Sequence, residues 1–203
     1  AFVSITASQG IDASSYNANS IVVTNDSTGD GRIISVRFDL SSALFPDIVF
    51  DPEGTAGDEA AKCFSANTGA ATVGLVAPAD PCFSPFSGSH DSGYDAIELS
   101  FSDFDPTETF AFSVDIDPTS IRGTSGSSLG GSVSGLELTG AAVIVTFDDD
   151  TVLAGQIFRQ TGSEGGGENT IRAGATATPS IQALALASPS STSDSSQVIR
   201  IAG

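Results

Sequence analysis

The chain has 203 residues, with 25 Asp and Glu against seven Lys and Arg, and a formal net charge of -18. Such a surface repels nucleic-acid phosphates and anionic lipid head groups, and no apolar run approaches the roughly 20 residues that span a bilayer, so we expect neither nucleic acid binding nor membrane insertion. The acidity favours Ca²⁺ as a structural cofactor, although it could also serve solubility alone.

The composition favours β-strands. Phe, Val and Ile supply most of the apolar bulk, Gly is abundant, and Met and Trp are absent. Alternating or apolar stretches predict strands in the first half of the chain at Phe2–Ala7, Ile21–Thr24, Arg32–Leu40 and Ile48–Phe50. A long excursion follows, from Asp51 to about Tyr94.

The second half continues the pattern with strands predicted at Ala96–Phe101, Thr109–Asp117, Ser132–Leu138, Ala142–Phe147, Thr151–Arg159, Ser180–Ala187 and Gln197–Ala202. Many short strands with turn residues between them predict an all-β fold. We expect an antiparallel β-sandwich, jelly-roll-like, with long loops and little helix. Residues 1–160 form the predicted sandwich domain, and residues 161–203 a Gly/Ser-rich connection whose C-terminal strands pack on the same domain.

The two cysteines predict a disulfide. Cys63 and Cys82 enclose a short segment that contains Gly and Pro and match no zinc-site spacing. A Cys63–Cys82 bond would hold a long loop and imply an oxidising, secreted or cell-surface location; two unpaired buried thiols are the alternative. The chain begins at Ala1, which agrees with a signal peptide having been removed.

Acidic loops supply candidate calcium ligands. A segment rich in Pro and Gly follows the short strand Ile48–Phe50 and could fold its carboxylates inward. The predicted metal ligands are Asp47, Asp51, Glu53 and Asp58. A solvated acidic loop is the alternative interpretation of the same residues.

Two further carboxylates, those of Asp115 and Asp117, are expected to lie about 6.5–7 Å apart along a predicted strand, close enough to share one cation. Phe110, Phe112 and Val114 occupy the other face of that strand. The alternation therefore favours an exposed polar face for the two Asp.

One further segment concentrates side chains that could contact a ligand. Residues 89–98 hold the only histidine, one of the two tyrosines and three carboxylates. Their polar groups can hydrogen-bond hydroxyls, and a Tyr ring can stack on a sugar. The predicted carbohydrate-binding residues are His90, Asp91, Tyr94 and Asp95. A hydrogen-bonded turn with no ligand is the alternative.

Three stretches carry a resemblance to known proteins. They are residues 33–58, which include LFPDIVFDPEGTAGD, residues 88–122, which include HDSGYDAIEL and FSVDIDPTSIRG, and residues 133–158, which begin VSGLELTG. Together they resemble secreted microbial β-sandwich modules attached to malectin-like and other carbohydrate-associated domains. The resemblance covers about two thirds of the chain. It implies an extracellular module that binds glycans or spaces other domains, and assigns no site residue.

The sequence thus predicts an extracellular, non-catalytic carbohydrate-binding module stabilised by calcium. A lone His and the lack of Trp argue against a hydrolytic triad and a deep sugar cleft, so we expect no enzyme. The alternative is a structural subunit of a surface layer, adhesin or filament that self-associates by strand pairing through Phe2–Ala7 and Gln197–Ala202. A calcium-stiffened spacer without a ligand is a third possibility.

Overall fold

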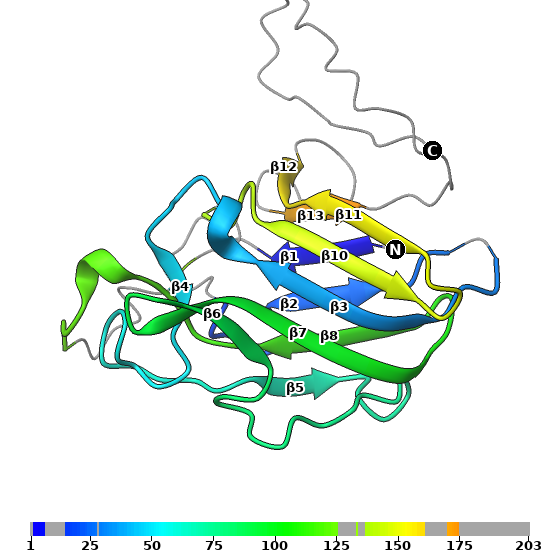
Figure 1. The fold of residues 1–203 in the computed structure, drawn as a ribbon, viewed down its shortest axis with the longest axis horizontal. Coiled ribbons are helices and arrows are strands. Elements are labelled where there is room, and N and C mark those ends of the chain that lie inside the picture. The colour runs from blue at the N-terminus through cyan, green and yellow to red at the C-terminus, as the bar shows by residue number, and fades with distance from the viewer. Residues whose placement is uncertain are drawn as a thin grey trace, which may run out of the picture.

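The structure, a computed structural model, describes residues 2–6, 15–27, 29–125, 133, 137–160 and 170–174. These residues form an all-β fold of two antiparallel sheets (Figure 1), which confirms the predicted fold class; the jelly-roll connectivity stays a prediction. The only helices in the described part are two single 3₁₀ turns, η1 (Leu40–Ser42) and η2 (Thr119–Ile121). Neither is long and apolar enough to cross a membrane.

The strands are divided between the two sheets, and the chain crosses from one sheet to the other several times. The first sheet has the order β12-β13-β1-β2-β8-β5, and the second has the order β11-β10-β3-β7-β4-β9, with β6 also paired to β7. The strands are β1 (Phe2–Thr6), β2 (Ile21–Thr24), β3 (Ile33–Asp39), β4 (Ile48–Phe50), β5 (Ser65–Thr68), β6 (Phe86–His90), β7 (Gly93–Phe104), β8 (Thr109–Ser113), β9 (Ile116–Pro118), β10 (Ala142–Phe147), β11 (Val152–Gln156), β12 (Phe158–Gln160) and β13 (Thr170–Gly174).

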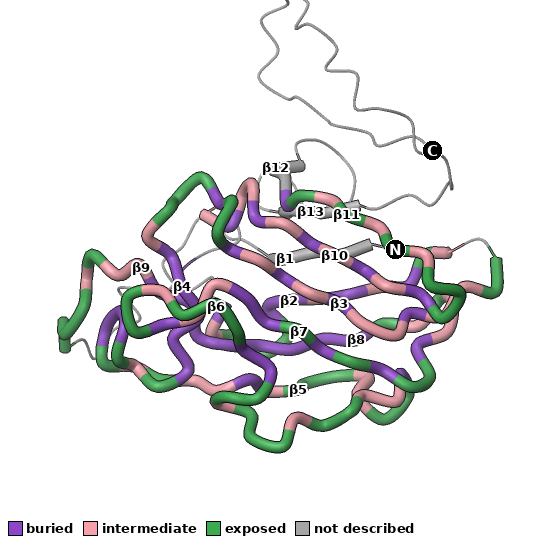
Figure 2. Tube along the Cα trace, in the orientation of Figure 1, coloured by how far each residue is buried: buried purple, intermediate pink, exposed green. Residues whose placement is uncertain are grey.

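The hydrophobic core lies between the sheets and is rich in phenylalanine. Phe38 of β3 meets Phe112 of β8 edge to face, with ring centroids 5.6 Å apart. Phe101 of β7 packs in the same way on Phe110 of β8 at 5.4 Å. Figure 2 shows the buried segments running through the middle strands of both layers. These aromatic contacts join the two sheets into one sandwich.

Two predicted strands are each divided between the sheets. The stretch predicted as Thr109–Asp117 forms β8 in the first sheet and β9 in the second. Thr151–Arg159 divides in the same way into β11 and β12. The residues at the crossings, Val114 and Ile157, are themselves buried, so the apolar pattern continues while the chain changes sheet.

Other segments depart from the prediction. The excursion after Asp51 contains β5 and the β6–β7 hairpin. Residues 137–140 form a turn rather than the end of a strand, and Gly140 has a φ of +91° in this turn. The side chain of Leu138, which belongs to the turn, is buried.

The N-terminal strand is an interior strand of its sheet. β1 pairs with β2 on one side and with β13 on the other. Its backbone groups are therefore engaged within the chain, which removes one of the two strands expected to pair with neighbouring copies. The other, Gln197–Ala202, and the strand predicted at Ser180–Ala187 lie outside the described residues.

Candidate functional site

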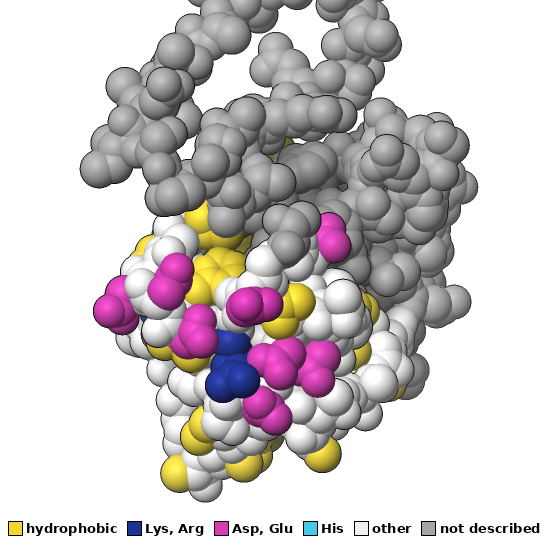
Figure 3. Space-filling model, turned by 90° about the vertical axis from the view of Figure 1, so that its right-hand side faces the viewer, with side chains coloured by type: hydrophobic (Ala, Val, Ile, Leu, Met, Phe, Trp, Pro, Cys, Tyr) yellow, Lys and Arg dark blue, Asp and Glu magenta, His cyan; other side chains and the backbone are white. Residues whose placement is uncertain are grey.

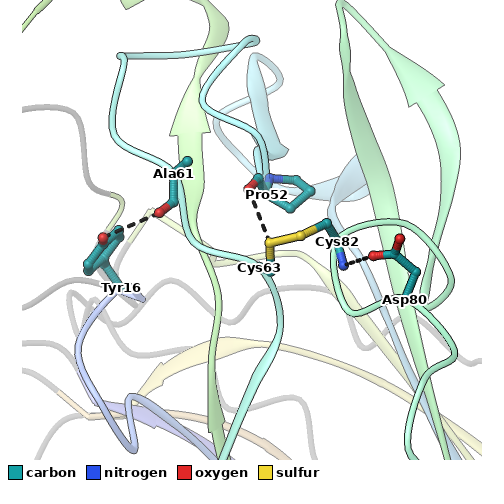
Figure 4. Close-up of a disulfide and its surroundings, with 6 residues drawn as sticks. All are labelled: Tyr16, Pro52, Ala61, Cys63, Asp80 and Cys82. Carbon is teal, nitrogen blue, oxygen red and sulfur yellow. Dashed lines mark hydrogen bonds between the residues drawn. A yellow bond between two sulfur atoms is a disulfide. The ribbon is translucent and has the colours of Figure 1, made fainter.

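The disulfide closes the long loop as predicted. Cys63 and Cys82 are bonded, with their Cα atoms 4.5 Å apart (Figure 4). The Phe64 N–H donates to the Pro81 carbonyl at 3.0 Å, so the backbones of the two loop ends are also hydrogen-bonded. The Cys82 N–H donates to Asp80 Oδ1 at 2.9 Å. The loop that leads from the acidic segment into β5 is thereby fixed at its base.

Four aspartates are buried at the end of the sandwich where β4 and β9 meet. Asp51, Asp115 and Asp117 are each 1% exposed and Asp58 is 5% exposed. They are the only fully buried charged side chains in the described part of the chain. β4 is buried along its whole length (Figure 2), and β9 is buried up to its last residue, Pro118. Buried carboxylates are costly unless they are hydrogen-bonded, protonated or paired with a cation.

Asp51 organises the loop that follows β4. Its Oδ1 accepts the Thr55 N–H at 2.8 Å, and its Oδ2 accepts the N–H groups of Ala56 at 2.9 Å and Gly57 at 2.7 Å. Three backbone N–H groups thus donate to the one carboxylate. Asp51 therefore holds residues 52–57 in a tight turn over the end of the strand.

The same loop covers β9. Asp117 Oδ2 accepts the Asp58 N–H at 3.0 Å, and Asp58 Oδ1 in turn accepts the Ala60 N–H at 2.7 Å. Gly57 approaches so closely that an added Cβ would lie 2.1 Å from the Asp117 Cβ. The prediction that Asp115 and Asp117 form an exposed face is therefore wrong, because residues 52–59 fold over a strand that lies at the sheet edge.

Asp115 is the least satisfied member of the group. Its Oδ2 is buried and has no hydrogen-bond partner. Burial, followed by the charges of Asp117, Asp51 and Asp58, raises its pKa to about 9. Burial and the neighbouring Asp58 also raise the pKa of Asp117, to about 6. The group is therefore an electrostatically strained set of carboxyls.

Lys62 is a basic side chain that interacts electrostatically with Asp115. Its carbonyl accepts the Asp115 N–H at 3.0 Å. Its ammonium instead donates to the Tyr16 carbonyl and lies 4.8 Å from the centre of the Tyr16 ring. Burial lowers the pKa of Lys62, while the charge of Asp115 acts in the opposite direction. No ion pair within 4 Å joins Lys62 to a carboxylate of the described residues.

The four predicted metal ligands are divided by this arrangement. Asp51 and Asp58 lie in the buried group, whereas Glu53 is exposed and Asp47 is half-buried before β4. The three-residue strand places Asp47 and Asp51 about 13 Å apart along the chain. Among the residues that the structure describes, no three His, Cys, Asp or Glu side chains are arranged so that they could hold a metal ion as they stand.

The predicted carbohydrate-binding residues lie on the β6–β7 hairpin. Its two turn residues, Asp91 and Ser92, have φ of +46° and +73°, and His90 pairs with Gly93 across the turn. Positive φ at both central positions defines a tight type I′ turn. His90 Nδ1 is 3.1 Å from Asp95 Oδ1, and His90 Nε2 is 3.5 Å from Asp91 Oδ2.

Tyr94 differs from the other three predicted residues. Its ring stacks on Phe86 with centroids 5.4 Å apart, and it packs against the core. One ring face is therefore occupied within the protein. The side chains of His90 and Asp91 are 37% and 60% exposed, and that of Asp95 is 27% exposed. The hairpin thus presents an imidazole between two carboxylates at the surface.

Arg122 joins the hairpin to the acidic loop, residues 52–59. Its guanidinium donates to the carbonyl of Asp91 and, at 3.2 Å, to the carbonyl of Ala56. The Thr55 hydroxyl also donates to the Ser92 carbonyl at 3.4 Å. The two segments that the sequence identified separately are therefore neighbours, at the left-hand end of Figure 1.

Exposed carboxylates gather at the opposite end. Figure 3 shows acidic side chains around a basic one there. Arg32 Nε lies 2.8 Å from Asp105 Oδ1, and Asp103 Oδ1 is 3.6 Å from the same guanidinium. Asp103 and Asp105 are 62% and 48% exposed, so water solvates their charges. This exposed group needs no ligand to compensate it.

Comparison with known proteins found no matching family model, no matching curated protein and no matching solved structure.

Proposed function

We propose that the chain is an extracellular, non-catalytic module that binds a glycan at the β6–β7 hairpin. The observation that carries the proposal is the surface cluster of His90, Asp91 and Asp95 on a tight two-residue turn. Sugar hydroxyls are recognised by side chains that accept and donate hydrogen bonds, and a rigid hairpin lowers the entropy cost of binding.

The bracing around the hairpin supports this assignment. Arg122 and Thr55 hold the backbone carbonyls of the turn, and Phe86 and Tyr94 pack beneath it. Loops that carry binding residues are commonly held by such a scaffold. In this proposal Tyr94 supports the hairpin from below, and the polar cluster makes the sugar contacts.

The disulfide and the resemblance to carbohydrate-associated modules support an extracellular location. Disulfides persist in oxidising compartments, and Cys63 and Cys82 are bonded in this chain.

Affinity electrophoresis through gels that contain plant and marine polysaccharides tests the proposal. We expect at least one polysaccharide to retard the wild-type protein, and His90→Gln and Asp95→Asn to reduce that retardation. Asp150→Asn is the matched control, because it removes one exposed carboxylate from a distant turn at a φ of +65° that Asn also adopts. Free migration of the wild-type protein through every gel, with and without calcium, would refute the proposal.

A further inference from the structure

We infer that the buried group of Asp51, Asp58, Asp115 and Asp117 binds one Ca²⁺ ion between β4, β9 and the loop that covers them. The site differs from the one that the sequence indicates, since it excludes Asp47 and Glu53 and includes two residues about 60 positions further along the chain. The inference does not rest on the proposed glycan binding.

Charge is the first reason. The four carboxyls are buried together, and the described residues place no ammonium or guanidinium in an ion pair with any of them. The two basic side chains nearby, Lys62 and Arg122, donate to backbone carbonyls of Tyr16, Ala56 and Asp91. A divalent cation is the simplest species that offsets several carboxylates in so little space.

The unpartnered oxygen is the second, independent reason. Asp115 is 1% exposed and its Oδ2 lacks any hydrogen-bond partner, although buried oxygens are almost always satisfied. Asp115 and Asp117 are two residues apart, and the chain at Asp115 lies against Asp51, whose N–H donates to the Asp115 carbonyl at 3.1 Å. Asp115 therefore lies beside Asp51, and its Oδ2 is left without a partner within this buried part of the protein.

Capacity is the third reason. Five backbone N–H groups donate to Asp51, Asp58 and Asp117. Each carboxylate has about four lone-pair sites, so most remain free. Ca²⁺ takes six to eight oxygens in flexible geometry and accepts water among them, which suits carboxyls that must turn by a side-chain rotation to meet it. Mg²⁺, which demands a near-ideal octahedron, fits less well.

Calcium titration of the metal-free protein tests the site. Isothermal titration calorimetry in chelator-treated buffer at neutral pH should give one Ca²⁺ per chain, and the melting temperature should rise by about 3–6 °C at ten times Kd. Asp115→Asn and Asp117→Asn should each weaken binding at least tenfold. Asp47→Asn and Glu53→Gln remove the same charge nearby and should leave the affinity within about twofold.

Two results would overturn the inference. One is a wild-type protein that shows neither heat nor a melting shift up to about 10 mM Ca²⁺, far above the range of about 10⁻⁴–10⁻³ M for weak extracellular sites. The other is loss of binding in Asp47→Asn or Glu53→Gln with full binding in Asp115→Asn. The wild-type titration decides the question even if a variant fails to fold, and glycan retardation is measured separately.

Discussion

Without calcium, the free energy of unfolding should fall as the pH rises from about 4 to about 9. The folded-state pKa of Asp115 is raised to about 9 from an ordinary value of 3.8, and that of Asp117 to about 6. The folded protein therefore holds protons that the unfolded chain releases. Their stabilising effect is complete below about pH 4 and is lost as the pH passes through the raised values.

The expected size follows from the number of protons. One proton bound in the folded state and absent from the unfolded state changes the free energy of unfolding by about 1.4 kcal/mol per pH unit. Asp115 remains protonated from pH 5 to pH 7 in the folded state, because its pKa is about 9. It alone therefore contributes a loss of at most about 3 kcal/mol over that interval, and Asp117 adds a smaller loss that is complete once the pH exceeds its pKa.

Urea unfolding in EDTA at pH 5, 6, 7 and 8, followed by circular dichroism, measures the slope. Asp115→Asn replaces a protonated carboxyl by a neutral amide of similar shape, so it should flatten the slope by about one proton and raise stability at pH 8. The exposed Asp150→Asn should keep the wild-type slope. If stability rises between pH 5 and pH 7 in EDTA, or if Asp115→Asn keeps the full slope, the electrostatic description of the group is wrong.

Three further predictions concern stability. Cys63→Ser with Cys82→Ser should lower the free energy of unfolding by roughly 3 kcal/mol, as measured by urea titration, because the bond closes a loop between residues 19 apart; an unchanged midpoint would contradict this. Gly57→Ala should lower the free energy of unfolding by about 3 kcal/mol or more, because the new methyl would lie 2.1 Å from the Asp117 Cβ. In the control Gly29→Ala the new methyl meets nothing within 4 Å, so this variant should be nearly neutral. Equal melting temperatures of the two variants would count against the packing of the loop on β9. Asn25→Ala should cost about 2 kcal/mol, because the buried amide donates to the carbonyls of Gly31 at 2.8 Å and Phe104 at 2.9 Å; hydrogen exchange of the β2–β3 connection should rise in this variant.

The strands with their own apolar pattern could be predicted from the sequence. Ile21–Thr24, Ile48–Phe50 and Ala142–Phe147 coincide with β2, β4 and β10. β5 and β6 could not, because Ser65–Thr68 is half-buried or exposed and Phe86–His90 buries only Phe86. These two segments are strands because β8 and β7 offer them free edges, and that information lies outside the segments themselves.

The candidate site was only half predictable for a related reason. The loop composition pointed to Asp51 and Asp58, and both lie in the buried group. The alternation through Phe112 and Val114 continues without a break and therefore predicts an exposed face for Asp115 and Asp117. Only the crossing between β8 and β9 and the packing of residues 52–59 on β9 place these two side chains inside. Contacts between residues about 60 positions apart leave no pattern within either segment of the sequence.

The acidic loop has three attachments of different chemistry, and this bears on how the proposed cation would affect the hairpin. The disulfide holds the chain just beyond the loop, backbone amides hold it to Asp51 and Asp117, and Arg122 ties its Ala56 carbonyl to the Asp91 carbonyl of the hairpin. Without a cation, repulsion among the carboxylates weakens the hold on the loop by Asp51 and Asp117, because these same carboxylates accept the loop's backbone N–H groups. A loop that moves away from β9 would carry the Ala56 carbonyl with it and release one of the two carbonyls that fix Arg122. Calcium should therefore order the hairpin through Arg122 without contacting it, and Arg122→Ala should remove any effect of calcium on glycan retardation while leaving calcium affinity unchanged.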